Sequence, residues 1–177
     1  MTTTTTSHPT DSPARVTSPR ATALAGRLEQ GARALIAFAS GLTDAEWKTR
    51  TTATDARTVG VIVHHVASVY PVEIQVAQTV ADGKPVTGVT MDDISAMNAQ
   101  HAVQNHAVTK EETLDLLRRN SAAAAAAIRA LTDEQLAQAA PVSLYSDAPL
   151  TCQFVLEDHA VRHSYHHLAR IRRAVRP

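Results

Sequence analysis

The segment TVGVIVHHVASVYPVEIQVAQTVAD, residues 58–82, constrains the fold most strongly because it is long and predominantly apolar. Its branched apolar residues recur at helical steps, as Val59, Ile62 and Val66 illustrate. Such residues also favour strands, but strands rarely exceed about 10 residues, and this segment is more than twice that length. It therefore predicts one long helix, with a kink at Pro71 because proline removes a backbone donor.

Similar periodicity predicts three more long helices and several short ones. Leucines recur on one face in two of the long segments, and Asp147 followed by Pro149 is a plausible start for the last. The aromatic content of 3% and the abundance of alanine favour a closely packed aliphatic core. We therefore predict an all-α four-helix bundle with long helices over about 20–42, 58–82, 109–131 and 149–174.

The connection between the second and third long helices is itself long. It contains a predicted short helix over about 92–106, whereas residues 139–148 are expected to form a loop. A connection of this length could run along the whole bundle. The second and third helices would then be parallel, unlike those of a simple up-and-down bundle.

Composition excludes several classes of protein. The chain has 177 residues, about one domain, and 17 basic against 17 acidic residues give no net charge. No nucleic-acid partner is therefore expected, since such binders are usually strongly basic. No apolar run reaches the roughly 18 residues of a membrane span, so no membrane partner is expected either.

The N-terminal segment and the single cysteine indicate the cellular compartment of the protein. Residues 1–20 are rich in Thr, Ser and Pro, lack the apolar stretch of a signal peptide and are expected to form a disordered tail before a domain at 21–177. Cys152 is the only cysteine, so no intrachain disulfide can form. These features favour the cytoplasm.

Histidines are the most informative feature for function. The chain has nine, and four of them, at positions 159, 163, 166 and 167, lie close together in the last predicted helix. Residues four apart share a helix face, so neighbouring pairs of His159, His163 and His167 could hold one metal ion. The whole row spans about 12 Å, so one ion cannot bind all three, and a further ligand must come from another helix.

The helix over 58–82 offers that ligand, because His64 and His65 interrupt its apolar run. A buried imidazole without a partner is costly, by about 1–3 kcal/mol, and a metal would offset that cost. Three neutral histidines with an open position are typical of catalytic zinc, which lowers the pKa of bound water or holds a thiol as thiolate. Spacing alone decides neither between His64 and His65 nor which metal is bound.

Two motifs resemble the DinB/YfiT-like superfamily of bacterial metal-dependent four-helix-bundle proteins. His65-Val-Ala, after a Thr-Val-Gly helix start, is similar to the family's first signature, and HSYHHLARI (163–171) is similar to its second. The stretch LTDEQ (131–135) is also typical of the family. The resemblance covers about residues 20–175.

The resemblance implies a ligand set and a topology. In that family one histidine of the second helix and two of the last bind a divalent metal, which here correspond to His65, His163 and His167. We expect zinc or nickel, with iron or manganese as alternatives. The resemblance also implies an up-down-down-up bundle. Whether His64 or His166 replaces one of these ligands stays open.

The resemblance also implies an activity. Members with assigned functions are often S-transferases of low-molecular-weight thiols such as mycothiol, bacillithiol or glutathione. We therefore expect a transferase with a small-molecule substrate, in which the metal activates the thiol. Two alternatives stay open: a hydrolase that uses metal-bound water, and a non-catalytic stress protein that binds a metal or small ligand. A homodimer is plausible for an alanine-rich bundle.

Further residues have weaker assignments. Arg170 could hold a cofactor carboxylate, although this chain lacks the Arg-Gly-Gln that often follows the last ligand in the family. Glu157 or Asp158 could orient a ligand histidine. No catalytic residue can be assigned: His64, His166 and Glu73 remain candidates for a general base. His101 and His106 could line the mouth of the site from the short helix in the connection, but surface positions are expected for both.

Overall fold

The computed structural model describes residues 18–52, 55 and 57–176. Most of the predicted tail lies outside these residues, but its last part does not belong to a tail. The first helix begins at Pro19, and Ser18 Oγ caps it by accepting a hydrogen bond from the backbone of Ala21 at 3.0 Å. The ordered domain thus starts slightly earlier than predicted.

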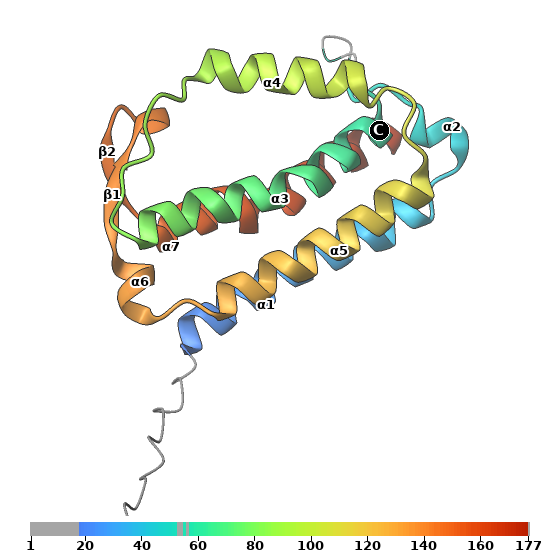
Figure 1. The fold of residues 1–177 in the computed structure, drawn as a ribbon. Coiled ribbons are helices and arrows are strands. Elements are labelled where there is room, and N and C mark those ends of the chain that lie inside the picture. The colour runs from blue at the N-terminus through green and yellow to red at the C-terminus, as the bar shows by residue number, and fades with distance from the viewer. Residues whose placement is uncertain (1–17, 53–54, 56, 177) are drawn as a thin grey trace, which may run out of the picture.

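The described part of the chain is mostly helical, with one small hairpin (Figure 1). Threonines cap most of the helices, and capping boxes are present at Thr43 and Thr132. The elements are α1 (Pro19–Ser40), α2 (Asp44–Trp47), α3 (Val59–Ala81), α4 (Met91–Gln104), α5 (Lys110–Arg129), α6 (Asp133–Ala137), β1 (Ala139–Val142), β2 (Ala148–Thr151), α7 (Cys152–Leu156) and α8 (Arg162–Val175).

Helices α1, α3, α5 and α8 form the bundle, and α3 and α5 run in the same direction (Figure 1). Both begin beside Trp47, which packs on Gly60 of α3 and donates a 3.2 Å hydrogen bond to the carbonyl of Val108, just before α5. Helix α1 ends there too, and Arg172 of α8 lies over the ring of Phe38. Helices α1 and α8 therefore run together, opposite to α3 and α5.

The core is aliphatic, as the composition predicted. Leu28, Leu35, Ile62 and Leu117 are among its largest fully buried side chains. Helix α3 lies deepest: by length and composition it could span a membrane, but 61% of its most apolar window is buried in the bundle. A buried helix of this kind is what the core of a soluble bundle requires.

The region between α6 and the last helix differs from the prediction. Instead of a loop, it contains an antiparallel hairpin in which Ala139 pairs with Thr151 and Val142 with Ala148. Asp147 does not cap a helix because its φ of 58° places it in the left-handed region, in the tight turn of the hairpin. The helical segment starts only at Cys152, where Thr151 supplies the cap.

The last long helix is not a regular α-helix. Between α7 and α8 the chain forms a π-helical segment, Glu157–Val161, without a break in direction (Figure 1). Such a segment takes up one residue more than an α-turn and changes the face that later residues present. The residues buried after it are Ser164, His167, Leu168 and Ile171.

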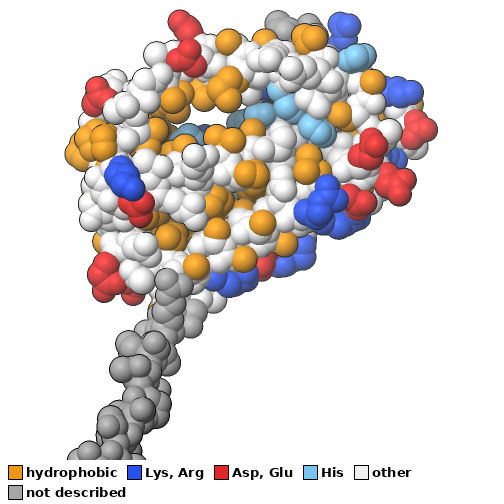
Figure 2. All heavy atoms as spheres, viewed as in Figure 1, with side chains coloured by type: hydrophobic (Ala, Val, Ile, Leu, Met, Phe, Trp, Pro, Cys, Tyr) orange, Lys and Arg blue, Asp and Glu red, His pale blue; other side chains and the backbone are white. Residues whose placement is uncertain are grey.

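Helix α4 stands apart from the bundle. None of its residues is buried, and Met91, Met97 and Val103 are exposed. Figure 2 shows a hollow between this helix and the bundle, with histidine side chains gathered at its edge. The long connection thus covers one side of α3 without filling the space beneath it.

Two glycines offer a matched test of the contact that joins the bundle at α2. A Cβ on Gly60 would lie 2.4 Å from Trp47 Nε1, whereas one on Gly26 of α1 would meet nothing within 4 Å. We expect Gly60→Ala to lower the free energy of unfolding by about 1–3 kcal/mol through overpacking. Gly26→Ala should raise it by about 0.5–1 kcal/mol through helix propensity. Urea denaturation of both variants measures this, and equal effects would contradict the packing.

Cys152 gives a prediction for alkaline pH. Burial raises the pKa of its thiol to about 11, above the value of about 8.5 in an unfolded chain. Below about pH 8 the thiol is protonated in both states and does not change the free energy of unfolding. As pH rises toward 11 it ionises more readily in the unfolded chain, which lowers the free energy of unfolding by about 1–2 kcal/mol at pH 10. We expect urea denaturation between pH 8 and 10 to show this loss in the natural protein and a shallower one in Cys152→Ala. Identical slopes would contradict it.

Candidate metal centre

Helices α3 and α8 bring three imidazoles together. His65 comes from α3, and His163 and His167 come from adjacent turns of α8. One ring nitrogen of each lies within 4.8 Å of the others. Zn–N bonds of about 2.0–2.1 Å place two nitrogens about 3.4 Å apart in a tetrahedral site, so a small movement of the rings would close them around one ion.

The ring orientations support this convergence. The rings of His163 and His167 are stacked, with centroids 4.8 Å apart, because the two residues lie one turn apart on the same helix face. The ring of His65 approaches from α3, and its Nε2 lies 3.2 Å from His163 Nε2. The structure therefore brings together the three histidines that the resemblance implied.

Glu73 orients one of these rings. Its Oε1 lies 2.5 Å from His163 Nδ1, so that Nδ1–H donates to the carboxylate and Nε2 is left facing His65. A carboxylate behind a ligand histidine fixes the tautomer and makes the imidazole a stronger ligand. Glu73 was predicted only as a possible base. Sequence spacing could not reveal its pairing with a residue 90 positions away.

Burial keeps the other two imidazoles neutral. It is the main cause that lowers the pKa of His65 to about 3 and that of His167 to about 2, and nearby positive charges add to it. Neutral imidazole is the form that binds metals. His167 Nδ1 and Glu73 Oε2 are also buried without hydrogen-bond partners among the described residues, a cost that a metal centre would account for. The residues present therefore fit a divalent ion.

The remaining histidines lie outside this group. His64 turns toward α4, where its Nδ1 is 2.9 Å from His101 Nε2. His166 is exposed, and His159 contacts the hydroxyl of Tyr145 at 3.2 Å. His101 was expected on the surface but is half-buried, and its ring meets that of His65 at 5.5 Å. A place for His101 beside the site was the less favoured alternative, because spacing alone does not show how closely α4 approaches the cluster.

The predicted orienting and cofactor-binding residues have other partners. Asp158 pairs with Tyr145 and Arg162, and Glu157 pairs with Arg27 on the surface, so neither orients a ligand histidine. The guanidinium of Arg170 binds Asp55 and the hydroxyl of Thr51.

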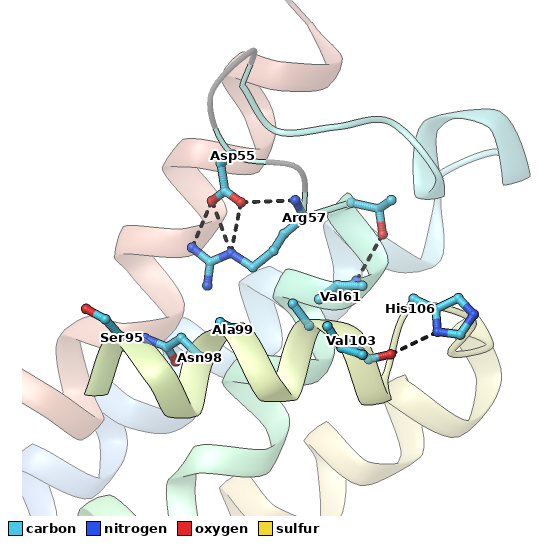
Figure 3. Close-up of a pocket in the computed structure, with 10 residues that line it drawn as sticks. Asp55, Arg57, Val61, Ser95, Asn98, Ala99, Val103 and His106 are labelled. Atoms are coloured by element: carbon cyan, nitrogen blue, oxygen red, sulfur yellow. Dashed lines mark hydrogen bonds and ion pairs between the residues drawn. The ribbon is translucent and has the colours of Figure 1, made fainter. Parts of the chain in front are cut away.

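A pocket of about 780 Å³ lies between the start of α3 and α4 (Figure 3). The loop before α3, the first turn of α3 and one face of α4 line it. Val61 in its wall precedes His65 by one turn on the same face of α3. None of the three imidazoles is among the described residues that line the pocket, but a small molecule in it would lie about one turn of α3 from His65.

Comparisons with known proteins agree with this fold. The family model of the DinB superfamily matches residues 27–171. Among solved structures, YfiT from Bacillus subtilis, described as "a probable metal-dependent hydrolase with an unusual four-helix bundle topology", is similar at a TM-score of 0.70. The two share 20% sequence identity, over 94% of this chain and 92% of YfiT. No curated protein matches. Because the family model spans most of the chain, the protein belongs to the DinB superfamily.

Proposed function

We propose that His65, His163 and His167 bind one divalent metal ion and that the protein is a metal-dependent enzyme. The observation that carries this proposal is the convergence of three ring nitrogens within 4.8 Å from two helices. Imidazole nitrogen suits zinc and nickel, and also iron, whereas manganese is a poorer match. The description of YfiT as a probable metal-dependent hydrolase is consistent with this class of function.

Such an ion supplies Lewis acidity: three neutral ligands leave its charge intact, and it lowers the pKa of a thiol or water that it binds. The chain's own residues have separate tasks. Glu73 holds the proton of His163 at Nδ1. The paired rings of His64 and His101, in which burial lowers both pKa values, remain neutral and can accept a proton beside the cluster.

The reaction that we propose is S-transfer from a low-molecular-weight thiol, such as mycothiol, to a small electrophile. An open pocket beside the cluster supports turnover over mere storage of a metal, because it gives a substrate access. Hydrolysis is the second candidate, and the description of the YfiT structure favours it. We also propose that the enzyme is cytoplasmic and homodimeric.

The metal site predicts a clear pattern of variants. The natural protein, purified and reloaded with zinc or nickel, should hold about one equivalent, and His65→Ala, His163→Ala and His167→Ala should each lose most of it. His159→Ala and His166→Ala remove histidines of the same helical region and should keep it. Elemental analysis measures the content. A natural protein that stays free of metal after reloading would refute the proposal.

Glu73 should tune the metal affinity without being a ligand. We expect Glu73→Ala to weaken zinc binding by about 10–100-fold, because His163 loses its orienting acceptor. Glu73→Gln keeps an acceptor oxygen at the same place and should lose less. Competition with a chromophoric zinc chelator measures both affinities. Unchanged affinity in Glu73→Ala would show that the 2.5 Å contact has no role in binding.

The reaction class needs a separate test. The zinc- or nickel-loaded protein should conjugate mycothiol, bacillithiol or glutathione to monochlorobimane, and His163→Ala should not. Cleavage of p-nitrophenyl esters without any thiol, lost in the same variant, would favour the hydrolase instead. If the metal-loaded protein shows neither activity, the metal site would be retained, but the proposal that the protein is an enzyme would be refuted.

A further inference from the structure

The pocket beside the histidine cluster has a positively charged edge. Asp55 accepts hydrogen bonds from the guanidinium groups of both Arg57 and Arg170, so one negative charge lies between two positive ones. Arg57 also lines the pocket, and Asp55 is the only carboxylate among the described lining residues. The group therefore carries one net positive charge where the pocket begins.

Arg57 has donors to spare. Its Nε and Nη2 bind Asp55 at 3.0 and 2.8 Å, which occupies one side of the guanidinium. An arginine has five N–H donors, so both protons of Nη1 and one of Nη2 remain. Figure 3 shows the remaining guanidinium nitrogen pointing away from Asp55 and toward α4, into the pocket. The two outer nitrogens form the planar fork that matches a carboxylate.

The rest of the pocket suits a short apolar body. Its apolar lining is Val61 of α3 with Ala99, Ala102 and Val103 of α4, and Thr58 adds a polar edge near Arg57. The polar side chains of Ser95, Asn98 and His106 also line it. Thr58 is also the N-cap of a helix of 23 residues, so the positive end of the helix dipole lies at the same place. Both features favour an anion at the loop end and apolar atoms along α4.

The pocket also has a direction with respect to the cluster. Along α3, one turn leads from Val61 to His65. Along α8, Arg170 follows His167 by three residues and closes the same end by binding Asp55. A ligand anchored at Arg57 would therefore extend along the pocket wall past Val61 toward the three imidazoles.

We infer that Arg57 binds the carboxylate of a small amphiphilic substrate, whose apolar body lies along α4 and whose other end reaches the histidine cluster. This deepens the proposed function by naming a substrate class, and the position of the reacting end rests on that function. The carboxylate site itself stands on the pocket and on Arg57 alone. It therefore exists whether or not the cluster holds a metal.

The test uses the full chain stripped of metal with EDTA, so that a carboxylate cannot bind an ion instead. Sodium butyrate is titrated into ¹⁵N-labelled protein at constant ionic strength, and butyramide serves as the neutral isostere. We expect saturable shifts of the Arg57 side chain and of amides in α4 with butyrate, and at least about tenfold weaker binding of butyramide. Equal binding of the two ligands, or no binding of butyrate, would overturn the inference.

Variants separate the pocket from general electrostatics. Arg57→Gln should weaken butyrate binding at least about tenfold, whereas Arg50→Gln removes the same charge from an exposed position of the neighbouring loop and should not change it. Ala99→Leu fills the pocket from a helix that has no buried residue, so it should block butyrate without unfolding the protein. Equal losses in Arg57→Gln and Arg50→Gln, or full binding in Ala99→Leu, would refute the site.

The two proposals fail independently. Butyrate binding in a protein that takes up no metal would retain the carboxylate site and reject the metalloenzyme. If the protein binds one equivalent of metal but does not bind butyrate, the metal centre would be retained and the role of Arg57 rejected.

Discussion

The burial of neutral imidazoles between α3 and α8 is the constraint on which the site depends. Removing an imidazole from water is tolerable only if it stays uncharged and its nitrogens find partners. Glu73 satisfies one nitrogen of His163, but a buried nitrogen of His167 has no partner within the described chain. The core of the bundle around them is mainly aliphatic, and His101 is a further imidazole that meets the ring of His65. The fold thus creates a deficit that a cation would fill.

The topology of the bundle determines both where the three imidazoles lie and where the pocket near them opens. Because α3 and α5 are parallel, the chain must return along the bundle, and α4 is that return (Figure 1). It carries His101 to the cluster and forms one wall of the pocket, yet buries none of its own residues. The tightly packed helices α3 and α8 hold the imidazoles, while the loosely packed α4 lines the pocket. Rigid placement of the ligands and an accessible pocket are therefore assigned to different elements.

The sequence was sufficient for the parts that depend on local pattern. Apolar periodicity identified the four long helices, and spacing limited the pair on the last helix to neighbours among His159, His163 and His167. The choice of His163 with His167, and of His65, came from the family resemblance. What the sequence missed depends on contacts between distant segments: Glu73 with His163, and His101 with the cluster. The hairpin was missed because a left-handed turn at Ser146 and Asp147 is not encoded by glycine.

The π-helical segment before α8 has a consequence for how such sequences can diverge. Each residue turns an α-helix by about 100°, so one residue gained or lost ahead of His163 would ordinarily swing both α8 imidazoles away from α3. Here a wider turn, Glu157–Val161, already holds an extra residue between the hairpin and the ligands. The side chains of α7 and α8 therefore follow separate helical registers, although the two helices belong to one uninterrupted helical segment. Sequences can therefore diverge in length in the hairpin before Cys152, whereas a residue gained or lost between Cys152 and His163 would rotate His163 and His167 by about 100°.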